Sequence, residues 1–134
     1  MKLKWILLIG FLLLLGCDEV VTRRYATRSA AKEDALFEKG WLPEIIPSSS
    51  RQIIVSNDLD TNTSKGEFYF DRSELPSFLA MLSEHQKNIT SLDDATERYR
   101  NSGYIPYTYD AAGSRWIFFI NSDREHAHYL MNPR

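Results

Sequence analysis

Side chains that carry oxygen recur at every second position in Asp58, Asp60 and Asn62, within a polar stretch that separates two apolar ones. This spacing is typical of the first ligands of a calcium-binding loop. The later positions depart from that pattern, because Thr63 stands where such a loop turns on glycine and Tyr69 stands where it needs a bidentate glutamate. Three interpretations are therefore open: a hairpin loop whose side chains bond their own backbone, a calcium site, or a surface that contacts a partner.

Two histidines alternate near the C-terminus, at His126 and His128. Alternate side chains of a strand lie on one face of the sheet, so the two rings could share a metal ion such as zinc. No third ligand is visible nearby in the sequence, and His85 would have to be brought to the pair by folding. The other interpretation is a pair of solvated histidines on a polar edge strand.

The remaining reactive side chains do not form a recognisable catalytic set. Serines are plentiful, but no Gly-x-Ser-x-Gly motif is present. The acids Asp93, Asp94 and Glu97 are explained by the exposed face and the negatively charged first turn of a predicted helix. The aromatic residues of segment 99–129 fit a sheet core, or a platform on which a ligand stacks. We therefore expect no enzymatic activity and no cofactor.

The N-terminus has the features of a secretory signal. Lys2 and Lys4 precede an apolar run, residues 5–15, and this run is shorter than the about 20 residues of a membrane-spanning helix. The run closes with Leu-Leu-Gly-Cys at residues 14–17, which is typical of a bacterial lipobox. We predict cleavage between Gly16 and Cys17 and a diacylglycerol on the Cys17 thiol, hence a lipoprotein that faces the periplasm or the cell exterior. The alternative is an uncleaved signal anchor with an ordinary thiol.

The charge balance limits the kinds of partner. The chain carries 16 basic and 18 acidic side chains, and loss of Lys2 and Lys4 with the signal leaves 14 basic ones. A mildly acidic chain is a poor partner for nucleic acid, because phosphate binding needs clustered Lys and Arg. The expected partners are the membrane, through lipidated Cys17, and an envelope protein. Since Cys17 is the single cysteine, no disulfide and no cysteine nucleophile is expected.

Apolar periodicity predicts one α+β domain: a mostly antiparallel sheet of about five strands with two or three packed helices. Residues 1–16 are predicted to be the signal peptide, residues 17–25 the lipidated tether and residues 26–134 the domain. The expected helices are residues 27–39, 73–83 and 92–100. The expected strands are residues 51–56, 66–70, 103–109, 115–121 and 126–131, the last of them at an edge of the sheet. In the first of these strands Ile53 and Val55 should lie on one face and Ile54 on the other, and in the second Phe68 and Phe70 should face inward.

The centre of the chain carries a set of short motifs. These are Gly40-Trp41-Leu42-Pro43, Asp58-Leu59-Asp60-x-Asn62 and Gly66-x-Phe68-x-Phe70. Together they make residues 26–80 resemble a group of small bacterial lipoproteins of the YbbD-head type. The resemblance implies a lipoprotein with a shared N-terminal module, and it implies neither an activity nor catalytic residues.

These observations favour a lipid-anchored envelope protein that has no enzymatic activity and works through contact with another protein. An immunity or toxin-neutralising role belongs to this class, because small envelope lipoproteins often serve it. The alternative is an envelope domain that binds a small ligand or a metal ion. The binding site would then be the Asp58–Asn62 loop or the His126 and His128 pair.

Overall fold

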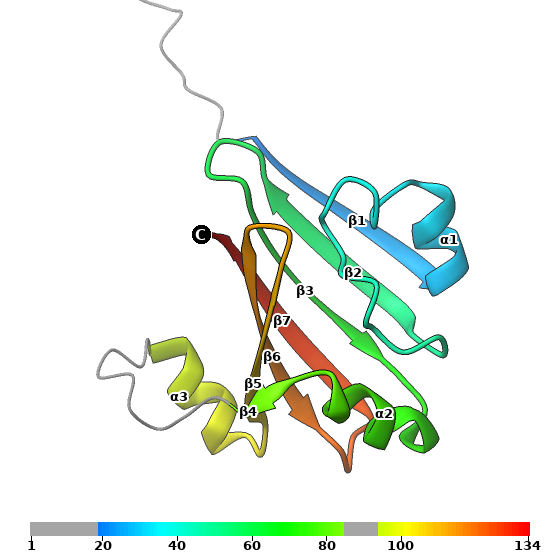
Figure 1. The fold of residues 1–134 in the computed structure, drawn as a ribbon, viewed down its shortest axis with the longest axis vertical. Coiled ribbons are helices and arrows are strands. Elements are labelled where there is room, and N and C mark those ends of the chain that lie inside the picture. Colours follow the sequence, from blue (N-terminus) through cyan, green and yellow to red (C-terminus); the bar gives the residue numbers. More distant parts are fainter. Residues whose placement is uncertain (1–18, 85–93) are drawn as a thin grey trace, which may run out of the picture.

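The computed structural model describes residues 19–84 and 94–134, which form a seven-stranded sheet with short helices on its two faces (Figure 1). The strand order is β1-β2-β3-β7-β6-β5-β4, and all neighbours are antiparallel. In chain order the elements are β1 (Val20–Thr27), α1 (Arg28–Glu33), β2 (Arg51–Asp58), β3 (Thr63–Tyr69), the 3-10 turn η1 (Arg72–Glu74), α2 (Leu75–Ala80), β4 (Ser83–Glu84), α3 (Asp94–Asn101), β5 (Ile105–Ala111), β6 (Ser114–Asn121) and β7 (His126–Pro133). The predicted cleavage and lipidation residues Gly16 and Cys17 lie outside the described residues, as do His85 and Asp93.

The α+β class predicted from the sequence is confirmed, with two more strands than expected. One of them is β1, which occupies most of the segment predicted to be a tether, so that the described fold begins at Val20 rather than at residue 26. Most side chains of β1 are exposed and polar, and they gave no strand signal. Pairing with β2, from Val20 opposite Asp58 to Thr27 opposite Arg51, supplies the backbone hydrogen bonds of β1 instead. The other additional strand is the two-residue β4 at the opposite edge.

The prediction that the last strand lies at an edge is wrong, because β7 lies between β3 and β6 near the middle of the sheet. Its histidines made the segment look polar, but Ala127, Tyr129 and Met131 alternate with them and are buried in the core. By pairing on both sides, β7 joins the β2–β3 hairpin to the β5–β6 hairpin. The predicted central strand β6 is indeed covered on both faces, since Phe118 and Phe119 are both fully buried.

The hydrophobic core lies between the sheet and a layer made of α1, segment 34–50 and α2 (Figure 1). Phe68 and Phe70, which were predicted to face inward, are fully buried, and so are Ile53 and Val55, which were predicted to share one face of β2. Phe78 of α2 meets Phe118 of β6 edge to face, with ring centroids 5.3 Å apart. This aromatic contact packs α2 against β6.

Helix α1 begins where the sequence predicted and ends earlier. The Thr27 hydroxyl oxygen accepts a hydrogen bond from the Ala30 N–H at 3.2 Å and caps the helix. The helix ends at Glu33 rather than at residue 39, because Ala35 takes a left-handed φ of 57° and turns the chain. Segment 34–50 then crosses the core face as a series of turns. Helices α2 and α3 match the other two predicted helices within a few residues at each end.

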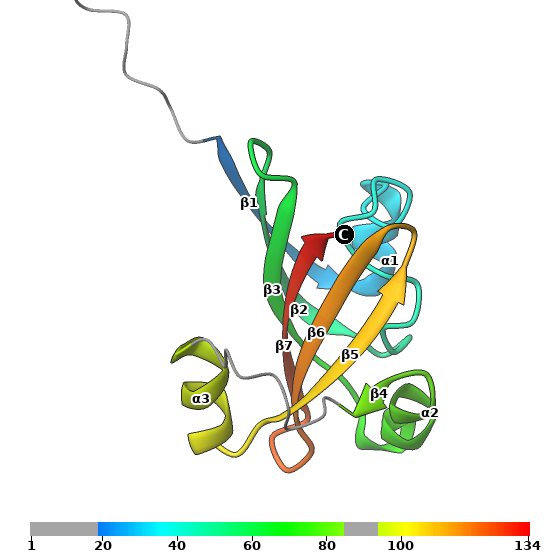
Figure 2. The same cartoon turned by 60° about the vertical axis from the view of Figure 1, so that its left-hand side comes forward.

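The two faces of the sheet carry different helices. Figure 2 shows α1 and α2 on one side and α3 alone on the other. We call the side that carries α3 the second face. No helix in the described ranges 19–84 and 94–134 is long and apolar enough to cross a membrane.

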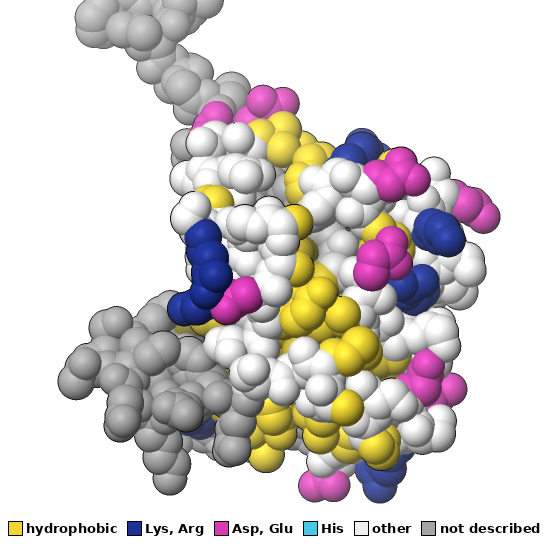
Figure 3. All heavy atoms as spheres, viewed as in Figure 1, with side chains coloured by type: hydrophobic (Ala, Val, Ile, Leu, Met, Phe, Trp, Pro, Cys, Tyr) yellow, Lys and Arg dark blue, Asp and Glu magenta, His cyan; other side chains and the backbone are white. Residues whose placement is uncertain are grey.

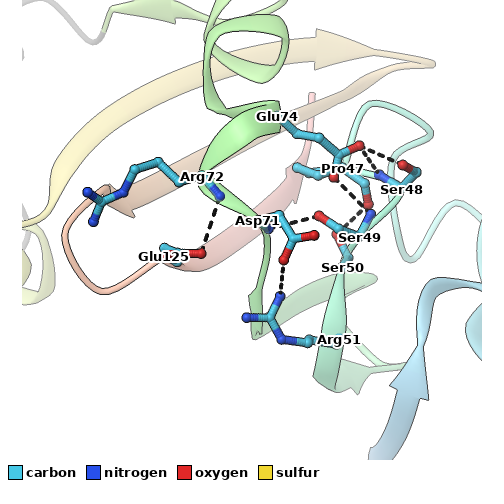
Figure 4. Close-up of polar contacts among 9 residues, drawn as sticks. All are labelled: Pro47, Ser48, Ser49, Ser50, Arg51, Asp71, Arg72, Glu74 and Glu125. Carbon is cyan, nitrogen blue, oxygen red and sulfur yellow. Dashed lines mark hydrogen bonds and ion pairs between the residues drawn. The ribbon is translucent and has the colours of Figure 1, made fainter.

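One carboxylate ties segment 34–50 to the start of α2 (Figure 4). Glu74 Oε1 accepts a hydrogen bond from the Ser48 N–H at 3.1 Å, and Glu74 Oε2 accepts one from the Ser49 N–H at 2.9 Å. The Ser48 hydroxyl also donates to Glu74 Oε1. These hydrogen bonds from Ser48 and Ser49 lower the pKa of Glu74 to about 2.

We expect Glu74→Gln to lower the free energy of unfolding by about 1–2 kcal/mol at neutral pH, because charge-assisted hydrogen bonds are lost. The folded-state pKa of Glu74 is about 2, below the ordinary value of 4.5. The stabilisation is therefore complete above pH 4.5 and disappears as the pH falls toward 2, where the carboxylate is protonated. Urea unfolding of both proteins between pH 2 and pH 7 measures this convergence. Glu38→Gln, at an exposed position, is the control and should show no such pH-dependent difference.

Candidate metal site on the second face

A row of paired residues crosses the second face of the sheet. Arg24 of β1 is opposite Ile54 of β2, and Ile54 is opposite Glu67 of β3. Glu67 in turn is opposite His128 of β7, which is opposite Phe119 of β6. Directly paired residues share a face of a sheet, so these five side chains lie on the same side. The row places a carboxylate directly beside a histidine.

Glu67, His126 and His128 bring three potential ligand atoms together. Glu67 Oε2 lies 3.4 Å from His126 Nε2 and 3.3 Å from His128 Nδ1. These distances are longer than the about 2.9 Å of a typical N–H···O hydrogen bond. They match the roughly 3.3–3.4 Å between ligand atoms around a tetrahedral zinc ion, whose bonds are about 2.0–2.1 Å long. Within residues 19–84 and 94–134 this is the only group of three His, Cys, Asp or Glu ligands whose atoms all lie within 4.8 Å of one another.

Aromatic side chains hold both imidazole rings in place. The Tyr104 hydroxyl lies 2.9 Å from His126 Nδ1, so the Nε2 atom of that ring faces Glu67. The ring of Tyr69 packs 4.4 Å from the ring of His126. On α3, Tyr99 packs 4.7 Å from the ring of His128. Ligand histidines commonly use their second nitrogen to bond an orienting group, and Tyr104 is placed for that task.

Burial prepares the two histidines for ligation. The side chains of His126 and His128 are 6% and 24% exposed, and that of Glu67 is 33% exposed. Burial lowers the pKa of both histidines, and the neighbouring His128 lowers that of His126 further, against the opposing influence of Glu67. The neutral imidazole is the form that binds metal ions. The lowered pKa values favour this neutral form of both rings, beside the carboxyl group of Glu67.

The site opens into two neighbouring pockets along the second face, which together we call the trough. One pocket of about 270 Å³ adjoins Glu67 and His128 and is lined further by Ile54, Lys65 and Tyr99. A neighbouring pocket of about 460 Å³ shares Glu67 and Ile54 and reaches Arg24 on β1. A metal ion at the site can thus be reached from solvent through this trough.

The sequence correctly predicted that His126 and His128 share a face, and it missed Glu67. The strand pairing of β3 with β7 delivers Glu67, and nothing in the local sequence shows which strands are neighbours. A glutamate that alternates with inward-facing Phe68 on a strand was the available signal that its side chain lies on the outer face. His85, which the sequence left as the possible third ligand, lies outside the described residues.

The Asp58–Asn62 loop is arranged around its own backbone. Asp58 Oδ1 accepts hydrogen bonds from the N–H groups of Asp60 at 3.0 Å and Thr61 at 3.2 Å. Asn62 adopts a left-handed φ of 52°, a conformation that asparagine tolerates in tight turns. This arrangement agrees with the interpretation of a hairpin loop. A calcium site or a partner contact in this loop stays a prediction.

Comparison with known proteins identifies the N-terminal part of the fold. The family model of the YbbD head domain matches residues 19–69. This segment is of the YbbD-head type. The match begins with β1, earlier than the resemblance inferred from the motifs, and ends with β3 rather than at residue 80. The YbbD head domain therefore contributes Glu67, whereas His126 and His128 come from the strand β7 that follows it. Searches of curated proteins and of solved structures found no match.

Proposed function

We propose that this protein is a bacterial envelope lipoprotein whose folded domain binds a divalent transition metal ion, preferably Zn²⁺, and catalyses no reaction. The proposal rests on the position of Glu67 Oε2, which lies 3.4 Å from His126 Nε2 and 3.3 Å from His128 Nδ1, with all three ligand atoms within 4.8 Å of one another. Two imidazole nitrogens and one carboxylate oxygen are a ligand set that zinc uses in proteins. Calcium fits this set poorly, because it takes six to eight oxygen ligands.

Titration of the full-length protein in mild detergent tests the metal site. We expect Zn²⁺ to bind with one ion per chain and a Kd of about 1 μM or below. A Kd of this size corresponds to a binding free energy of only about 8 kcal/mol. Zn²⁺ should raise the Tm, whereas Ca²⁺ should not. Asp60→Ala is the control for the acidic loop and should leave Zn²⁺ binding unchanged. Absence of Zn²⁺ binding, or its loss in Asp60→Ala, would refute the proposed site.

The proposed lipid anchor would hold the domain close to the bilayer. Strand β1 begins three residues after Cys17, and a linker of that length spans at most about 11 Å. A diacylated cysteine is sufficient to keep a small domain at a membrane, because two acyl chains anchor far more firmly than one. The domain would then sit beside the membrane of the envelope, facing the periplasm or the cell exterior.

Cys17→Ser is expected to remove the anchor. The wild type should fractionate with membranes and show the mass of a chain that begins at a lipid-modified Cys17. The variant should accumulate unprocessed or appear in the soluble fraction. Intact mass spectrometry with membrane fractionation measures both properties. A wild-type chain that keeps its signal, or that appears free of lipid, would refute the proposed anchor. The proposal of the metal site does not depend on this result.

A second candidate function, contact with an envelope protein, is favoured by an apolar surface on the opposite side of the molecule. Figure 3 shows hydrophobic side chains gathered in the middle of this side and toward α2. Met81 is 48% exposed there, and with Ile45 it lines a pocket of about 500 Å³. In-cell crosslinking of a tagged chain should recover a defined partner, and Met81→Lys should reduce its recovery. Equal recovery with Met81→Lys would exclude this surface.

A further inference from the structure

We propose that the metal ion keeps one coordination position open toward the trough and binds there the carboxylate group of an exogenous ligand, with Lys65 and Arg24 assisting. This inference rests on the metal site proposed above and names the chemical class of its ligand. A small organic acid and the C-terminus of a peptide both carry a carboxylate group. Either ligand would bind the metal ion through this group.

The geometry leaves the open position on the trough side. All three ligands project from two neighbouring strands, β3 and β7, so they approach the ion from the side of the sheet. Tyr104 lies against His126, and Tyr99 of α3 lies against His128. A tetrahedral ion with three protein ligands has one position left. The two pockets that adjoin Glu67 are lined by β1, β2 and β3, and one of them also by β7 and by Tyr99 of α3; a fourth ligand would arrive through these pockets.

The charge balance favours an anion at that position. A divalent ion with one carboxylate and two neutral imidazoles leaves a net charge of about +1 at the site. Lys65 precedes Glu67 by two residues on β3, so both side chains lie on the same face, and Lys65 lines the adjoining pocket. Arg24 lies in the same row two strands away and lines the second pocket, a distance of about 10 Å across the ladder. Among the residues that line these two pockets, Glu67 is the single acid.

The lining of the pocket favours a carboxylate with an apolar body. Ile54 and Leu130 line the pocket beside Lys65, and both are partly exposed in the trough. Carboxylate oxygen is an ordinary zinc ligand. An acid with a short alkyl chain can place its head on the metal and its body against these two side chains. Each methylene group that is removed from water adds to the affinity, so a longer chain should bind more tightly.

Cobalt substitution separates this inference from the metal site itself. The full-length protein is first loaded with Co²⁺, whose visible spectrum reports its coordination, and is then titrated with acetate, butyrate and acetamide. We expect acetate and butyrate to change the spectrum to saturation, with butyrate binding several-fold more tightly, and acetamide to have no effect. Alanyl-alanine and its C-terminal amide form a second pair that distinguishes a peptide source from a small acid. Saturation by either free carboxylate supports the inference.

Lys65→Met provides the test of the assisting charge. It should weaken butyrate binding to the Co²⁺-loaded protein by about 2- to 5-fold, the size of an exposed charge interaction. Lys32→Met on α1, on the other side of the sheet, is the matched control and should leave butyrate binding unchanged. Failure of Co²⁺ and Zn²⁺ to bind would overturn the proposed function. A bound ion whose spectrum ignores every carboxylate, or responds to inorganic phosphate alone, would overturn this inference and leave the metal site standing.

Discussion

Gly66→Ala is expected to destabilise the domain by about 3–5 kcal/mol, at the upper end for a single substitution. A Cβ atom at this position would lie 2.0 Å from the carbonyl oxygen of Ile54 and 2.8 Å from the Tyr129 hydroxyl. The nearer obstacle is backbone, so β2 would have to move away from β3 where Val55 pairs with Gly66. The cost is steric, and it cannot be relieved locally because Gly66 lies within the paired part of β3.

Gly40→Ala is the matched control for this prediction. Gly40 has a left-handed φ of 74°, and a Cβ atom added there would meet no other atom within 4 Å, so alanine should cost only about 1 kcal/mol. Urea unfolding followed by tryptophan fluorescence measures both variants. Tyr129→Phe should not rescue Gly66→Ala, because the Ile54 carbonyl remains in place. Equal stability of the two glycine variants would contradict the β2–β3 register.

The sequence allowed prediction of those parts of the fold that have a local signal. Alternating apolar residues located β2, β3 and β6, and they also gave the correct inward face at Phe68. The start of α1 near residue 27 was likewise predictable, because the Thr27 cap is a contact between residues three apart. Each of these features follows from neighbours in the chain.

The missed features depend on partners that are distant in the chain. β1 has exposed, polar side chains, and only its pairing with β2 makes it a strand. The central place of β7 depends on β3 and β6 lying on either side of it. Glu67 became a candidate ligand for the same reason, since 59 positions separate it from His126, and the β3–β7 pairing closes that distance. The candidate site was therefore half predictable: the histidine pair has a local pattern, whereas the carboxylate does not.

Replacing a metal ligand is expected to lower Zn²⁺ affinity far more than replacing any neighbouring residue. Glu67→Gln keeps the shape of the side chain but removes the negative charge, and His128→Gln removes one nitrogen ligand. We expect each to weaken Zn²⁺ binding by more than about 100-fold, because substitution of a group that only orients a ligand costs about 10- to 100-fold. Zn²⁺ should then no longer raise the Tm of either variant.

Tyr104→Phe completes the series because it removes only the hydroxyl that lies 2.9 Å from His126 Nδ1. It should weaken Zn²⁺ binding by about 10- to 100-fold, the cost of losing an orienting group, while the three ligand atoms remain. Competition with a chelator of known affinity measures all variants on one scale, and circular dichroism without metal confirms that each is folded. If Glu67→Gln binds Zn²⁺ as tightly as the wild type, Glu67 is a hydrogen-bonding neighbour of two histidines and not a ligand. If the ligand variants lose the most affinity and Tyr104→Phe loses less, the graded loss separates the metal ligands from the hydroxyl that only orients His126.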